Sequence, residues 1–169
     1  MSSASQPSAY GGPTPVATAS VTITLFTNSQ AGSVTNISGQ CLDSGGNTIP
    51  GRNFTGMGQG AKENFQNVVT NCPVTFKWSE QSNLAVLCTA FNMAFTHPSV
   101  PSGAASPFAQ PSYSHDFNPG LSSPNTLISP NIVNGNASWI YSGSVTTQVS
   151  GQNAVALPFD PEIEVAAIG

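Results

Sequence analysis

Short segments in which apolar and polar residues alternate recur along this chain, and they restrict what it can fold into. In residues 20–27 and 73–79 every second side chain is apolar, and several of these are β-branched or aromatic. Successive side chains of a strand point to opposite faces, so this period of two predicts strands with one buried face. The 14 prolines and 16 glycines interrupt the chain often, so long helices are not expected.

Most other segments also predict strands. Residues 34–42 predict a weaker strand. Residues 61–69 place Phe65, Val68 and Val69 at positions i, i+3 and i+4, which predicts a short helix. Residues 83–95 fit either a helical stripe or a strand buried on both faces, and the neighbouring strands favour the strand. Further strands are predicted at residues 137–142, 144–150, 153–159 and 161–169.

This pattern predicts an all-β fold, an antiparallel β-sandwich or jelly roll of about seven to eight strands. Residues 20–169 are expected to form a single sandwich domain, and residues 1–19, which carry no charge, an extended N-terminal arm. Residues 97–131 hold half of the prolines, so we expect a long Pro-rich loop there instead of a strand ladder. The loop contains Phe108 and Tyr113, whose rings favour docking on a surface.

Charged side chains are scarce, and this excludes several classes of partner. They make up 6% of the residues, against about 25% in an ordinary globular domain. Arg52, Lys62 and Lys77 are the only basic residues, too few to neutralise a nucleic-acid backbone or to dock on an anionic membrane. No apolar run reaches the roughly 18 residues of a transmembrane helix. We therefore expect no nucleic-acid or membrane partner, and a surface wetted by the 23 Ser, 15 Thr and 15 Asn residues.

The three cysteines, Cys41, Cys72 and Cys88, cannot all pair within one chain. Cys88 lies in an apolar segment and is expected to be a small buried hydrophobe. Cys41 and Cys72 either form a disulfide or remain free thiols, and both alternatives stay open at this point.

The sequence lacks the familiar catalytic motifs. It holds no G-x-S-x-G elbow, no phosphate loop followed by Lys-Ser/Thr and no G-x-G-x-x-G. His97 and His115 are the only imidazoles, and the order of Cys, Met and His around them does not match a copper site, so no metal or other cofactor is expected. Asp160, Glu162 and Glu164 cluster near the C-terminus, where a polar strand edge is a simpler interpretation than an acid–base pair. We predict that the chain is not an enzyme.

These features favour a structural subunit of a large assembly, specifically a virion protein such as a phage capsid decoration (cement) protein or minor capsid protein. Residues 1–20 lack the basic and apolar regions of a signal peptide. Ordering an arm costs about 1–2 kcal/mol per residue, more than its sparse apolar atoms repay, so we expect neighbouring subunits to hold it. The partners would be copies of this chain, another capsid protein or both, with a homo-oligomer expected. The candidate partner-binding residues are Pro7, Tyr10, Pro13, Pro15, Val16, Phe108, Tyr113 and Phe117.

The alternative is a secreted adhesin or carbohydrate-binding β-sandwich module, located outside the cell or on its surface. Trp139 and Tyr141 are two residues apart and share one face of a predicted strand. Aromatic rings on an exposed sheet face are suited to stacking on sugars. The two rings are therefore the candidate ligand surface of this alternative.

Overall fold

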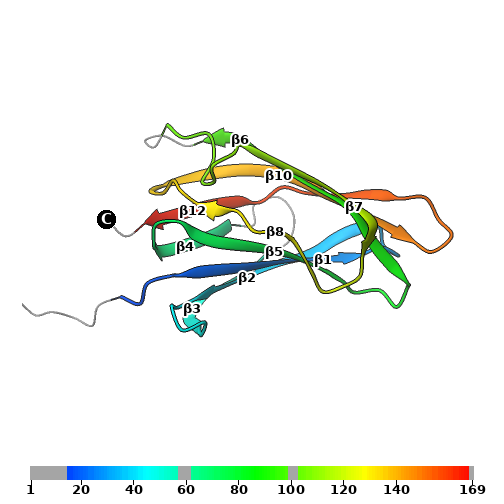
Figure 1. The fold of residues 1–169 in the computed structure, drawn as a ribbon, viewed down its shortest axis with the longest axis horizontal. Coiled ribbons are helices and arrows are strands. Elements are labelled where there is room, and N and C mark those ends of the chain that lie inside the picture. The colour runs from blue at the N-terminus through cyan, green and yellow to red at the C-terminus, as the bar shows by residue number, and fades with distance from the viewer. Residues whose placement is uncertain (1–14, 57–61, 99–102, 168–169) are drawn as a thin grey trace, which may run out of the picture.

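The computed structural model describes residues 15–56, 62–98 and 103–167. Within these ranges the chain forms twelve strands and no helix (Figure 1). They are β1 (Ser20–Asn28), β2 (Ser33–Leu42), β3 (Thr48–Gly56), β4 (Lys62–Val68), β5 (Cys72–Glu80), β6 (Val86–Pro98), β7 (Ser112–Leu121), β8 (Asn125–Ile128), β9 (Asn131–Ile132), β10 (Ala137–Val149), β11 (Val155–Phe159) and β12 (Glu162–Ala167). The all-β prediction is confirmed, but the expected seven to eight strands are too few.

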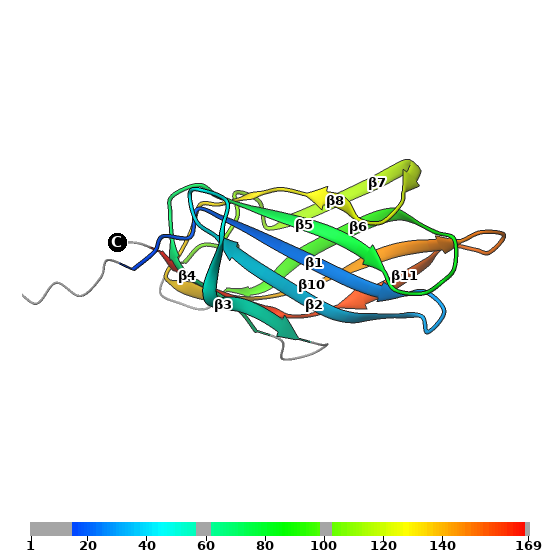
Figure 2. The same cartoon turned by 90° about the horizontal axis from the view of Figure 1, so that it is seen from below.

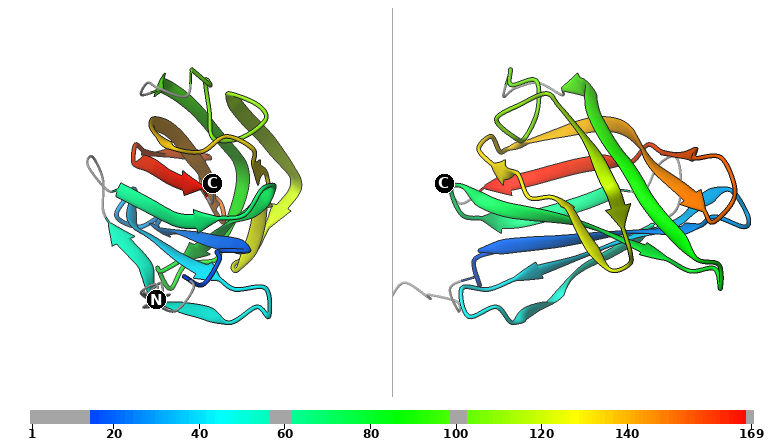
Figure 3. Two further views of the ribbon diagram at one scale, coloured as in Figure 1. Left: turned by 90° about the vertical axis from the view of Figure 1, so that its left-hand side faces the viewer. Right: turned by 45° about the vertical axis from the view of Figure 1, so that its right-hand side comes forward.

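The strands form two six-stranded sheets that lie one over the other (Figures 1 and 3). The first sheet has the order β3-β2-β1-β5-β8, with β9 also paired to β5. The second has the order β4-β12-β10-β6-β7, with β11 also paired to β10. The expectation of an antiparallel architecture is wrong in two places, because β1 pairs with β5 and β4 with β12 in parallel. Consecutive edge strands β3 and β4 belong to different sheets, and the chain crosses between the sheets there.

The core lies between the two sheets and is built by strand alternation. In β1, which runs between β2 and β5 in Figure 2, Val21, Ile23 and Leu25 are buried and the residues between them are half-buried. In β5, Phe76 and Trp78 face the same interior. These two segments fold as the alternating pattern predicts, because each has one apolar face for the opposite sheet to cover.

Residues 61–69 were expected to be helical, and this expectation is wrong: β4 occupies most of the segment. Phe65 and Val68 both face the core although they are three positions apart, because Asn67 is an extra residue in the strand. Ala166 and Ala167 of β12 pair with Gln66 and Val68, so Asn67 is skipped, and its φ is 51°. The bulge imitates a helical spacing.

The expectation that residues 97–131 hold no strand ladder is also wrong, since β7 and β8 lie there and β9 begins at residue 131. β7 is the outer strand of its sheet and pairs only along β6. Pro119 lies in an irregular part of β7, opposite the stretch of β6 between Cys88 and Ala90, where the register of the β6–β7 pair shifts. Prolines are tolerated on edge strands and at bulges because no ladder hydrogen bond is lost.

All three cysteines are buried free thiols, so Cys41 and Cys72 do not form a disulfide. Burial raises the pKa of the Cys72 and Cys88 thiols to about 12. A thiol with such a pKa stays protonated and unreactive at neutral pH. The cysteines therefore act as small apolar side chains of the core.

Candidate functional site

Trp139 and Tyr141 do not form a ligand surface, which corrects the expectation from the sequence. Both side chains are 0% exposed and point into the core from β10. The Trp139 indole Nε1 donates a hydrogen bond to the carbonyl of Ala104 at 2.9 Å. Since alternate residues face outward, the outer face of β10 carries other residues instead, among them Ile140, Ser142 and Ser144.

The candidate partner-binding residues fall into three groups. Pro7, Tyr10 and Pro13 lie outside the described residues, whereas Pro15 and Val16 are exposed. Phe108 is 2% exposed and packs on Phe76 and Phe95 of its own domain, so its assignment to a partner surface is wrong. Tyr113 and Phe117 are half-buried. The Tyr113 ring makes an edge contact with the Phe108 ring, and the Phe117 ring stacks on that of His115.

Residues 15–19, the described part of the arm, are held by this chain itself. Thr18 is buried; its N–H donates to the Asn67 carbonyl at 2.8 Å and its hydroxyl to the Gln66 carbonyl at 2.7 Å. Arg52 of β3 donates to the carbonyl of Val16 and to the hydroxyl of Thr18. The expectation that only neighbouring subunits can order the arm is therefore wrong for this part of it.

A groove lies on the outer face of the second sheet, where β6, β10 and β11 run side by side. Its volume is about 680 Å³. The register pairs Asn92 of β6 with Ser144 of β10, and Ser144 with Pro158 of β11, which brings the three strands together at the groove. The Asn92 amide donates to the Ser144 hydroxyl at 2.7 Å. The lining residues are Asn92, Ala94, Ser142, Gly143, Ser144, Pro158, Phe159 and Asp160.

The chain geometry around Asp160 accounts for this groove. β11 pairs with one half of β10 and β12 with the other half, and Asp160 lies in the connection between them. The next residue, Pro161, is buried, and its carbonyl accepts a hydrogen bond from the Tyr141 N–H at 3.1 Å. Gly143 has no side chain to obstruct the junction; a Cβ there would come within 2.7 Å of the Phe159 ring.

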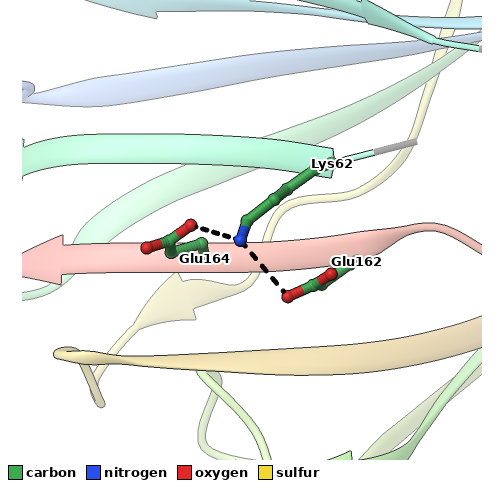
Figure 4. A network of polar contacts seen from close by, with 3 residues as sticks. All are labelled: Lys62, Glu162 and Glu164. Atoms are coloured by element: carbon green, nitrogen blue, oxygen red, sulfur yellow. Dashed lines mark ion pairs between the residues drawn. The ribbon is translucent and has the colours of Figure 1, made fainter. Parts of the chain in front are cut away.

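Acidic groups dominate this outer face. Asp160 is the only charged residue among the described residues that line the groove. On the adjacent β12, Glu162 and Glu164 both form ion pairs with Lys62, at 3.5 and 2.6 Å (Figure 4). The two glutamates do not protect a sheet edge, as expected from the sequence, because β12 lies between β4 and β10. They compensate the charge of Lys62 across a parallel strand pair.

A carboxyl group is buried in the core of the sandwich. Glu63 of β4 is 1% exposed, and the hydroxyl of Tyr141 donates to both of its oxygens at 3.0 Å. Burial raises the pKa of Glu63 to about 8, although the hydrogen bond from Tyr141 acts in the opposite direction. Glu63 is thus predominantly protonated at neutral pH. It lies away from solvent and supports the structure rather than a reaction at the surface.

A second carboxylate, Glu80, links the two sheets through hydroxyl groups. It accepts hydrogen bonds from the Thr27 hydroxyl at 2.6 Å and from the Ser29 N–H at 2.8 Å. The Ser29 hydroxyl also contacts the hydroxyl of Thr147 on the second sheet at 2.9 Å. Burial would raise the pKa of Glu80, but these hydrogen bonds and those of Ser82 outweigh it and lower the pKa. The carboxylate is fully engaged in holding strand ends together.

The outer face of the first sheet carries almost no charge. Along the described strands of this sheet, Lys77 is the only charged side chain at an outward-facing position. Arg52 turns toward the arm and Glu80 toward the sheet interface. The face is otherwise formed mainly by hydroxyl and amide side chains, among them Thr22, Thr24 and Gln40, which adjoin one another in the register.

Among the described residues, no three His, Cys, Asp or Glu side chains gather in an arrangement that could hold a metal ion. No helix in the described part of the chain is long and apolar enough to cross a membrane. No protein-family model matches the sequence, and no curated protein matches it either. The candidate sites therefore rest on the geometry of this chain alone: the uncharged face of the first sheet and the groove on the second.

Sequence reasoning missed both surfaces for the same reason. The residues that line the groove come from β6, β10, β11 and the β11–β12 connection, and only strand pairing brings Asn92, Ser142 and Asp160 together. Serines on one strand face are a weak signal in a sequence rich in serine. The composition shows that the chain has few charged residues. It does not show that one whole sheet face is almost without them.

Proposed function

We propose that this chain is a structural subunit of a large assembly, as a virion protein of the phage decoration (cement) or minor capsid kind. The observation that carries the proposal is the outer face of the first sheet, where Lys77 is the only charged side chain among the described strand residues. Burying a charge against a neighbouring subunit is costly unless it is paired, whereas hydroxyl and amide groups exchange water for protein partners at little cost. Interface cores are correspondingly depleted of charged residues.

The arm supports the same proposal. Arg52 and Thr18 fix residues 15–19 at one end of the sandwich, and Val16 is 51% exposed there. The chain N-terminal to this point, residues 1–14, has no charged residue. An uncharged segment can join a neighbour by adding to a sheet edge or by entering a groove. The partners would be copies of this chain, another capsid protein or both.

A charge-insertion experiment tests this assignment of the interface. Thr22 faces outward from the centre of the first sheet, between Gln40 of β2 and Thr75 of β5. We expect the wild-type chain to form oligomers, measured by light scattering after size exclusion and by negative-stain microscopy. Thr22→Lys should weaken this association by at least about tenfold, because a lysine would be desolvated at the interface. Gln30→Lys, the same charge change in the exposed β1–β2 turn, should leave it intact.

A wild-type chain that stays monomeric up to high micromolar concentration would contradict self-assembly. Association that Thr22→Lys leaves unchanged would contradict the interface, since the oligomer would then form through another surface. Circular dichroism of both variants establishes that the sandwich still folds.

A further inference from the structure

We propose that the groove on the outer face of the second sheet binds a neutral saccharide. This inference goes beyond the proposed assembly function and depends on the opposite face of the molecule. It places sugar binding on β10, as the carbohydrate-binding alternative did, but on the side away from Trp139 and Tyr141. The residues that would carry it are Asn92, Ser142, Ser144 and Asp160.

The size and position of the groove suit a small ligand. Its volume of about 680 Å³ lies within the range of roughly 300–1,000 Å³ typical of ligand pockets. Most of the lining comes from three hydrogen-bonded strands, so Asn92, Ser142 and Ser144 are held by the sheet, while Asp160 lies in the short connection between β11 and β12. Sites built on sheet strands hold their groups more rigidly than sites on loops.

The chemistry of the lining matches a polyhydroxylated compound. The Asp160 carboxylate accepts hydrogen bonds, the Asn92 amide both donates and accepts, and the serine hydroxyls do both. Sugar hydroxyls also donate and accept, so they can satisfy this mixed set. Ala94 and Pro158 add apolar surface for the C–H face of a sugar ring.

Two contacts arrange the groove before a ligand arrives. The hydrogen bond from Asn92 to Ser144 fixes the amide, so the rest of its donors and acceptors have a defined direction. The bond from the Tyr141 N–H to the Pro161 carbonyl fixes the chain beside Asp160. Preorganised groups lose less entropy on binding than mobile ones.

Charge distinguishes neutral from anionic sugars. Of the eight described residues that line the groove, Asp160 alone is charged, and none is a cation. The nearest cationic side chain along this face, Lys62, is already paired with Glu162 and Glu164. A sugar carboxylate would therefore meet uncompensated negative charge, so sialic acid should bind worse than neutral sugars.

The test is a two-dimensional NMR titration of the ¹⁵N-labelled full chain. The probes are glucose, galactose, mannose and N-acetylglucosamine, their common disaccharides, and N-acetylneuraminic acid as the anionic comparison. We expect at least one neutral sugar to shift the amide signals of Asn92, Ser142 and Ser144. Asp160→Ala should weaken this binding at least about tenfold, because a charge-assisted hydrogen bond is lost.

Two further variants separate the site from general effects. Asp160→Asn keeps the shape and one acceptor, so its loss should be smaller than that of Asp160→Ala. Asp116→Ala removes the same charge from β7 and should leave binding unchanged. The proposal is overturned if no neutral sugar binds at millimolar concentration, if only the anionic sugar binds, or if Asp160→Ala binds as the wild type does. Thr22→Lys, the assembly variant, should not affect the titration, so the two proposals can fail independently.

Discussion

The hydroxyl of Tyr141 lies 3.0 Å from both carboxyl oxygens of Glu63, and both side chains are buried between the two sheets. The pair joins β4, an edge strand, to β10 in the middle of the same sheet. Burial raises the pKa of Glu63 and the pKa of Tyr141, so both groups are neutral over most of the physiological pH range. A neutral pair avoids the cost of an isolated buried charge.

Stability should therefore fall as the pH rises. Glu63 binds its proton up to about pH 8 in the folded chain, against an ordinary value of 4.5, so between these values the folded state holds a proton that the unfolded state has released. The free energy of unfolding then decreases with increasing pH, by at most roughly 1.4 kcal/mol per pH unit for Glu63. Above about pH 8 the buried thiols, whose pKa is also raised, add to the decrease, so urea unfolding from pH 5 to 7.5 measures the slope that belongs to Glu63.

Glu63→Gln supplies the control, since the amide keeps the shape and a hydrogen-bond acceptor for Tyr141 but does not titrate. Its stability should be nearly independent of pH over the same window. Glu80 does not interfere, because its pKa is lowered and its contribution is lost only as the solution becomes acidic. An equal slope in the wild type and in Glu63→Gln would show that another group is responsible.

Gly39 should not tolerate a side chain. It pairs with Phe54 across the β2–β3 ladder, and the Phe54 ring occupies the space that a Cβ of residue 39 would need. The same ring packs on Phe65 at 5.4 Å between centroids, so moving it would expose part of the core edge. We expect Gly39→Ala to destabilise the fold by about 1–3 kcal/mol in chemical unfolding.

The double variant Gly39→Ala/Phe54→Ala identifies the cause. With the ring removed, the alanine at position 39 should cost little beyond the loss that Phe54→Ala causes by itself. If both single losses add fully in the double variant, the two residues do not interact as the structure indicates.

Asn67 should accept glycine but not a β-branched residue. Its φ of 51° lies in the left-handed region, which asparagine and glycine adopt most readily. Asn67→Gly should change stability little, whereas Asn67→Val should cost about 1–2 kcal/mol. Thermal unfolding of the two variants checks the difference. Equal stabilities would argue against the bulge between β4 and β12.

Arg52 should protect the start of the domain from proteolysis. Its guanidinium donates to the carbonyl of Val16 at 2.6 Å and to the Gln66 carbonyl at 3.2 Å. Arg52→Ala removes these bonds, so residues 15–17 should be cleaved several times faster by elastase, with a stability loss of about 1 kcal/mol. Mass spectrometry locates the cleavage. Arg52→Lys, which keeps the charge but not the planar fork, should lie between the alanine variant and the wild type.

Several elements were predictable because their signal lies within one segment. β1 and β5 show strict alternation with apolar residues on one face, and β6 was favoured as a strand by its strand neighbours. β4 was missed because Glu63 puts a polar residue at an inward position and Asn67 adds a bulge. β7 was missed because Pro119 and the other prolines of residues 97–131 argue against a central strand, whereas β7 lies at a sheet edge, where proline is tolerated.

The amino-acid order by itself determined that this is an all-β chain, and that neighbours such as Trp139 and Tyr141 lie on one side of their strand, because the alternation of a strand is a local property. Only the tertiary structure decided whether that side faces the core or the solvent. Burial depends on where the opposite sheet lies, and that sheet is assembled from segments far away in the chain. The same long-range pairing put Asn92, Ser144 and Asp160 around one groove and left one sheet face almost without charge.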